Sequence, residues 1–182
     1  MEQLVIGVFF VLFTLEFIVE SVLNELNLSC VRARRPAGHI PDFIAAKMSA
    51  QEYDKSVQYT LAKGNFQRYS EVYGRVLMLV VLFGGLLPFC DRVASSLAGA
   101  PPSLPYANGI IFCFGVGLIF SLAGLPVDLF ATFGLEARFG FNKTTWRLYL
   151  GDKLKGILLG VIIGAPFLMV VFWLMDNPGP YW

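Results

Sequence analysis

Four long apolar stretches constrain this chain more than any other feature of its sequence. They cover residues 4–23, 73–90, 107–127 and 154–175. A helix needs about 20 apolar residues to cross the hydrocarbon core of a bilayer, and each stretch approaches that length. Only 15% of the 182 residues are charged, against about 25% in a typical soluble domain. The sequence predicts an all-α integral membrane protein with four transmembrane helices, forming one membrane domain over residues 1–182.

The basic residues predict how these helices are oriented. Lysine and arginine collect in cytoplasmic loops of membrane proteins. The second loop holds only Arg92, and neither terminal segment holds any basic residue. The first loop holds Arg32, Arg34, Arg35, Lys47, Lys55, Lys63, Arg68 and Arg75, and the third holds Arg138, Lys143, Arg147, Lys153 and Lys155. Loops one and three are therefore expected in the cytoplasm and both termini on the opposite side.

Both cytoplasmic loops are predicted to contain an amphipathic helix. In the first loop, Ser49 and Glu52 have the spacing of a capping box, which marks the start of a helix. An apolar residue then recurs at every fourth position, and Gly64 is expected to interrupt the helix. In the third loop, Trp146, Tyr149 and Lys153 fall on one stripe, as in a helix lying at a membrane surface.

Two features inside the spans predict packing and polarity. Gly156, Gly160 and Gly164 form a stripe with four-residue spacing, which lets a neighbouring helix approach closely, and packing within the chain is favoured over homodimerisation. Glu16 lies deep in the first span, where a charge facing lipid is costly. It is expected either to line a cavity or to form a structural ion pair.

The chain lacks the common catalytic and metal-binding motifs. His39 is the only histidine, so no HExxH motif and no zinc site built on several histidines exists in this chain. The three cysteines include no Cys-x-x-Cys pair, and we interpret them as free thiols. The net charge of +1 argues against nucleic acid as a partner. We expect no metal and no cofactor to be bound by this chain.

Residues of the third loop resemble a signature of a known family. The segment from Phe133 to Thr145 contains Glu136, Arg138 and Phe139, followed by Gly-Phe-Asn-Lys at 140–143. This pattern closely resembles that of the type I CAAX prenyl proteases, which are integral-membrane zinc metalloendopeptidases. The segments 53–66, 125–126 and 148–156 are also similar to that family, so the resemblance covers essentially the whole chain.

The resemblance reaches only the amino-terminal half of such a protease. In that family an HExxH helix and a later glutamate hold zinc, and all of them lie further along the chain. The resemblance thus implies a membrane domain that is truncated, expressed alone or separately encoded, and that is inactive by itself. It further implies a chamber beside the metal site and a substrate with a prenylated carboxy-terminal tail. The implied partners are the lipid bilayer and the missing catalytic half or a separate catalytic subunit.

The same resemblance suggests which residues face the catalytic part or the substrate. The candidates are Glu136, Arg138, Phe139, Asn142 and Lys143, although a loop that merely ties two spans together is an equal alternative. Other functions stay open at this point. One is a stand-alone, non-enzymatic membrane scaffold that binds a lipid or a partner subunit. Another is a transporter or channel, for which Glu16 is the only supporting feature. The host membrane is either a bacterial inner membrane or the endoplasmic reticulum.

Overall fold

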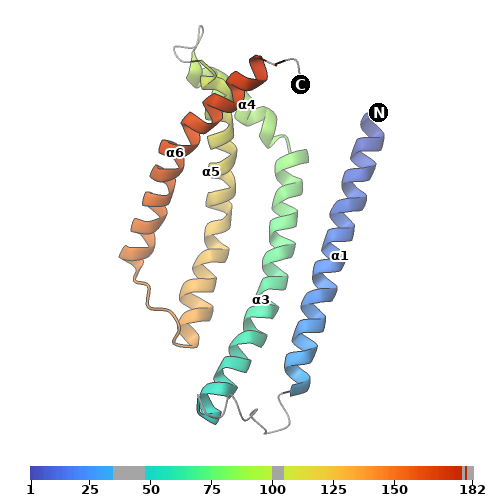
Figure 1. The fold of residues 1–182 in the computed structure, drawn as a ribbon, viewed down its shortest axis with the longest axis vertical. Coiled ribbons are helices and arrows are strands. Elements are labelled where there is room, and N and C mark those ends of the chain that lie inside the picture. The colour runs from blue at the N-terminus through green and yellow to red at the C-terminus, as the bar shows by residue number, and fades with distance from the viewer. Residues whose placement is uncertain (35–47, 100–104, 178, 180–182) are drawn as a thin grey trace. The chain divides into compact units, whose positions relative to one another are not determined.

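The chain is helical, as its sequence predicts. A computed structural model describes residues 1–34, 48–99, 105–177 and 179, and these ranges contain no strand. The elements are α1 (Glu2–Arg34), α3 (Ala50–Phe83), α4 (Leu86–Ala98), α5 (Ala107–Leu129), the π-helix η1 (Phe130–Glu136) and α6 (Trp146–Asp176) (Figure 1). Two compact units divide the chain, Met1–Val72 and Tyr73–Trp182, so the prediction of one domain stays a prediction.

Three helical segments of the described chain are each long and apolar enough to cross a membrane. They are Gln3–Ala33, Ala107–Glu136 and Trp146–Asp176. The predicted second span, residues 73–90, is not a single straight helix. It contains the break between α3 and α4, whose axes differ by 60°. Gly85 adopts φ 77° there, a left-handed conformation that ends a right-handed helix and that glycine tolerates. The described part of the chain therefore has three helices that could each span a membrane, and a fourth span if α3 and α4 together form one.

The predicted surface helices are continuous with longer helices. The capping box is present: the Glu52 N–H donates to the Ser49 hydroxyl oxygen at 3.3 Å, and the Glu52 carboxylate accepts from the Ser49 N–H at 2.9 Å. From there α3 continues without interruption to Phe83, so the expected break at Gly64 is wrong. The aromatic and basic stripe of the third loop forms the first turns of α6 in the same way. No proline or capping signal separates these polar turns from the apolar ones that follow.

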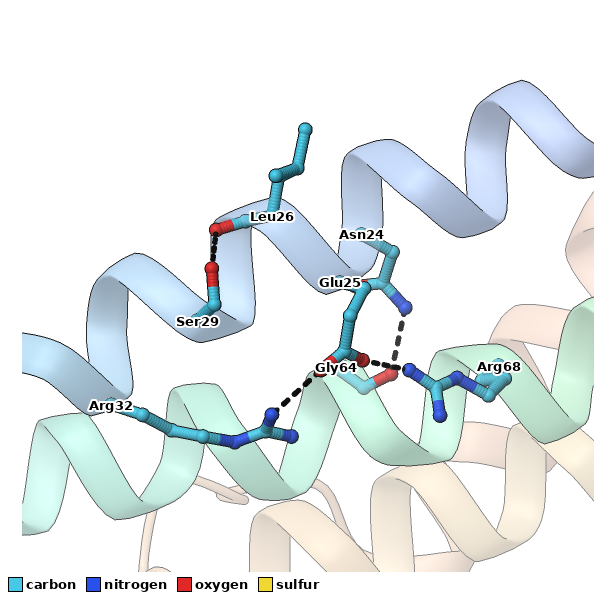
Figure 2. A network of polar contacts seen from close by, with 7 residues as sticks. All are labelled: Asn24, Glu25, Leu26, Ser29, Arg32, Gly64 and Arg68. Carbon is cyan, nitrogen blue, oxygen red and sulfur yellow. Dashed lines mark hydrogen bonds and ion pairs between the residues drawn. The ribbon is translucent and has the colours of Figure 1, made fainter.

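In the unit Met1–Val72, α1 and α3 make close contact. Leu28 is only 1% exposed, and a Cβ atom on Gly64 would lie 2.5 Å from its Cδ2 atom. The Asn24 amide donates to the Gly64 carbonyl oxygen at 3.2 Å. Figure 2 shows the Glu25 carboxylate accepting from both Arg32 and Arg68 beside this contact. A glycine here allows one helix to approach the other, and polar groups then join the two backbones.

In the unit Tyr73–Trp182, α5 and α6 lie side by side (Figure 1). At one end of the pair, the Tyr106 and Phe172 rings lie 6.0 Å apart, centre to centre. A Cβ atom on Gly109 would lie 2.9 Å from the Phe172 ring. The opposite end of the pair carries η1 and the loop to α6, where the family signature lies. That end holds the candidate functional site.

Candidate functional site

A polar cavity opens where α5, η1, the following loop and α6 meet. Its volume is about 560 Å³. The first three of these segments contribute Ser121, Thr132, Glu136 and Thr144 to its lining, and α6 contributes Tyr149, Asp152, Lys153, Gly156 and Ile157. The π-helix η1 forms part of the cavity wall through Thr132 and Glu136, and π-helical segments are frequent at functional sites.

Glu136 ends the π-helix and shapes the loop as well as the cavity. Its side chain lines the cavity, and its carbonyl oxygen accepts from the N–H groups of Phe141 at 3.0 Å and Asn142 at 3.3 Å. Gly140 has φ 70°, a value that favours glycine and lets the chain fold back onto the helix end. The signature glycine and glutamate thus have a local structural role in addition to any role in the cavity.

The other four candidates lie outside the cavity lining. The Asn142 side-chain oxygen accepts from the Thr144 N–H at 2.6 Å, so it closes a tight turn within the loop. Arg138 and Lys143 are exposed, and Phe139 is half-buried. The structure separates Glu136 from Arg138, because only Glu136 faces the cavity. Whether these residues face a catalytic part or a substrate stays a prediction.

Three further contacts at this site involve residues that are absent from the sequence-based site candidates. Lys153 Nζ lies 2.5 Å from a carboxylate oxygen of Asp128, and it lies 5.6 Å from the centre of the Tyr149 ring. Phe133 of η1 stacks on Trp146 with ring centres 4.0 Å apart. These contacts fasten the start of α6 to the end of α5 and to η1. The four-residue spacing of Tyr149 and Lys153 gave a signal, but nothing in the spacing identified Asp128 as the partner.

The glycine stripe of α6 borders the polar cavity and a second, apolar cavity. The second cavity, about 280 Å³, is lined by Phe114, Gly117, Leu118, Ser121, Ile157, Gly160 and Val161. A Cβ atom on Gly164 would lie 3.2 Å from the Phe114 ring. In the described part of the chain, a Cβ atom on Gly156 or Gly160 would meet nothing within 4 Å. Close helix packing along the whole stripe therefore stays a prediction.

Glu16 belongs to the other unit, Met1–Val72. It lies on α1 beside Phe9, Phe13, Val19 and Glu20, and the surface hollow that these residues border is lined by α1 alone. Apolar neighbours do not lower the cost of a carboxylate in lipid, so the choice between a cavity and a structural ion pair stays open. Its role in function stays a prediction.

The described residues do not gather a set of metal ligands. No group of three or more histidine, cysteine, aspartate or glutamate side chains lies together in the part of the chain that the structure describes. His39 lies outside the described residues. Catalytic zinc needs three protein ligands and an open position, so the residues described here do not fit that ion.

Comparisons with known proteins identify the family. Residues 31–182 match the family described as "CAAX prenyl protease N-terminal, five membrane helices". A CAAX prenyl protease 1 homologue from Arabidopsis thaliana is 27% identical over 168 residues, covering 91% of this chain and 39% of the relative. The human homologue is 27% identical over 154 residues, covering 82% of this chain and 32% of the relative.

A solved structure agrees with the sequence comparisons. The crystal structure of S. mikatae Ste24p matches with a TM-score of 0.79 and 26% identity, covering 91% of this chain and 38% of that one. The chain thus spans less than two fifths of the length of these three proteins. The helical fold, the membrane-spanning helices and the sequence signature all agree with these matches. The chain belongs to the CAAX prenyl protease family and is the membrane N-terminal domain of that family.

Proposed function

We propose that this chain forms the membrane wall of a chamber in which a CAAX prenyl protease receives its prenylated substrate. The observation that carries the proposal is the position of Glu136. This signature residue lines a polar cavity. An apolar cavity between α5 and α6 shares two lining residues with the polar cavity. A prenylated tail combines a polar peptide with an apolar chain, so it matches both parts.

The proposal assigns the metal chemistry to another part of the enzyme. Zinc, when bound, supplies an activated water for peptide hydrolysis, and the described residues offer no ligand set for it. This chain would bind the substrate, exclude bulk water from the prenyl group and present the tail to a catalytic half or subunit. Purified alone, it should contain no stoichiometric zinc and cleave no prenylated peptide. One tightly bound zinc per chain, lost on His39→Ala, would contradict this assignment.

Binding tests the proposal directly. The purified chain in lipid nanodiscs should bind a fluorescent, farnesylated Cys-aliphatic-aliphatic-X peptide more tightly than the same peptide without the farnesyl group. The reason is the burial of apolar chain in the cavity between α5 and α6. Fluorescence anisotropy with empty nanodiscs as the control separates protein binding from partition into lipid. Equal anisotropy in loaded and empty nanodiscs would instead favour a scaffold that binds a different lipid or a partner subunit.

The proposed orientation places the polar cavity at the cytoplasmic side. The basic residues collect in loops one and three, and the cavity is lined by residues of the third loop and the start of α6. Cysteines introduced near Ser49 and Thr144 should react with membrane-impermeant reagents only from the cytoplasmic side. Cysteines near Ser103 and Asn177 should react only from the opposite side. Labelling of Ser49→Cys and Ser103→Cys from one face would refute the four-span arrangement.

A further inference from the structure

We infer that Glu136 and Asp152 make this site prefer prenylated peptides with lysine or arginine beside the prenylated cysteine. The inference rests on the proposed function, because it takes a prenylated peptide as the occupant. It adds a selection by charge, for which the lining of the polar cavity is responsible. Three points support it: the lining residues that the two cavities share, the charges of the polar cavity, and the chemistry of prenylated tails.

The two cavities between α5 and α6 adjoin each other. Both are lined by Ser121 and Ile157, so we call them together the α5–α6 trough. One end holds Glu136 and Asp152, and the other holds aromatic and aliphatic side chains such as Phe114. An apolar chain lying in the apolar end therefore places its polar attachment beside the two carboxylates.

The glycines of both helices give the trough its space. Gly117 of α5 and Gly160 of α6 line its apolar end, and Gly156 lines its polar end. A Cβ atom on any of these three would meet nothing within 4 Å among the described residues. Larger side chains at these positions would fill the space, so the trough depends on the absence of side chains here.

Among the residues that line the polar end, the carboxylates of Glu136 and Asp152 outnumber the one ammonium group, which belongs to Lys153. The ammonium group of Lys153 is already paired with Asp128 at 2.5 Å. The Oδ1 atom of Asp152 lies 3.9 Å from Nζ of Lys155. Their side chains are 61% and 80% exposed, so solvent weakens the attraction between them. Glu136 has no ion-pair partner among the residues that the structure describes. The polar end should therefore attract an ammonium or guanidinium group and repel a second carboxylate.

The chemistry of prenylated tails supplies such a group. Prenylated cysteines are usually preceded by basic residues or accompanied by a second, palmitoylated cysteine, and the first kind of tail is the one that this site would select. A peptide whose prenyl chain occupies the apolar end would bring these basic side chains to Glu136 and Asp152. Ion pairs at partly exposed sites are weak, so we expect a preference of about fivefold in Kd rather than an absolute selection.

The test compares two farnesylated peptides that differ only in having two lysines or two glutamines before the cysteine. The purified chain is placed in nanodiscs of uncharged, zwitterionic lipid, so that the bilayer itself does not attract lysine. We expect the lysine peptide to bind about fivefold more tightly by fluorescence anisotropy. The preference should shrink as salt is raised. It should disappear in the double variant Glu136→Gln/Asp152→Asn, to which the lysine and glutamine peptides should bind with equal affinity.

The controls separate failure of this inference from failure of the proposed function. Asp54→Asn removes a carboxylate from the start of α3, outside the trough, and should keep the full preference. If both farnesylated peptides bind equally to the wild-type chain, the inference is wrong and the proposed function stands. If neither farnesylated peptide binds better than its unmodified form, the proposed function itself fails. A double variant that keeps the preference, or that loses affinity for both peptides alike, would also overturn the inference.

A second pair of variants tests the continuity of the trough. Gly160→Leu fills the apolar end and should weaken the binding of both farnesylated peptides by the same factor, so that the preference for the lysine peptide is unchanged. Gly151→Leu makes the same change on α6 at a position that lines neither cavity, and it should leave both affinities unchanged. Equal behaviour of the two glycine variants would mean that the prenyl chain does not lie in the trough.

Discussion

Glycines have opposite consequences in the two units of this molecule. In Met1–Val72, Gly64 is covered by Leu28, which is almost fully buried against it. In Tyr73–Trp182, Gly156 and Gly160 border open cavities. Lipid provides no hydrophobic force between helices, so contact depends on close packing and polar bonds. The α1–α3 contact has both, whereas the α5–α6 trough leaves room that a ligand or another helix could take.

The comparison teaches that a glycine in a membrane helix does not by itself predict close packing. What differs is the partner side chain opposite the glycine. Leu28 projects into the space at Gly64, and Asn24 then bonds the glycine carbonyl oxygen. Opposite Gly160 the facing positions include another glycine, Gly117. Two glycines that face one cavity leave space between the helices. A glycine that faces a leucine leaves none, because the leucine side chain fills the space.

The largest effect is expected from Gly64→Leu. The new side chain must displace Leu28, which is buried and has little room to move, and it would lengthen the bond from Asn24 to the glycine carbonyl. We expect a loss of about 3 kcal/mol in unfolding free energy, as for strong overpacking. Denaturation in mixed micelles would measure it. Gly74→Leu on the same helix, where a Cβ meets nothing within 4 Å, is the control, and equal losses would show that the contact at Gly64 is not special.

Leu28→Ala should lower the unfolding free energy by about 2 kcal/mol, because it leaves a void where the Leu28 side chain is now buried, with 1% exposed. The sharper measurement combines it with Gly64→Leu. A leucine at position 64 should be better tolerated when position 28 is small, giving a coupling free energy of about 1 kcal/mol or more. Additive losses in the double variant would mean that the two side chains do not share one space.

Asp128→Asn should lower the unfolding free energy by about 1 kcal/mol or less. It breaks the pair with Lys153, whose two side chains are 49% and 38% exposed, so solvent already weakens their attraction. The reverse charge pair, Asp128→Lys with Lys153→Asp, should restore part of the loss. A loss several times larger would show that the start of α6 is far more tightly fastened than these exposures imply.

The smallest effect is expected from Gly160→Leu, which should change the unfolding free energy by less than about 0.5 kcal/mol. Nothing within 4 Å meets a Cβ atom at this position in the described chain. Thermal unfolding of Gly160→Leu beside Gly151→Leu is the measurement. A large loss confined to Gly160→Leu would reveal a neighbouring helix against the stripe, and the contrast between the two units would then no longer hold.

Much of the fold could be predicted from the sequence because apolar length and helix caps are local signals. The three clear spans follow from hydropathy, and the capping box at Ser49 and Glu52 has the predicted bonds. The break between α3 and α4 falls at Gly84-Gly85, and glycine weakens a helix. The sequence does not predict the 60° bend, because its size depends on how α4 packs against α5.

The candidate site was less predictable, because it depends on contacts between distant residues. The family signature singled out Glu136, which does line the cavity. The same signature contains Asn142, whose side chain closes a turn. A motif does not reveal which of its members serve the loop and which face a cavity. Asp128 and Lys153 lie 25 positions apart in the sequence and on different helices, and no periodicity in either helix predicts that they pair.

The π-helix at the end of α5 makes the cavity sensitive to chain length as well as to side chains. Seven residues, Phe130–Glu136, take the wider winding. Such a segment is commonly equivalent to an α-helix with one added residue. Deleting one residue between Phe130 and Gly134 would return the segment to α-helical winding and turn the following residues by roughly 100° about the helix axis. Glu136 would then leave the cavity without being mutated, so a single-codon deletion could silence the site while every candidate residue is still present.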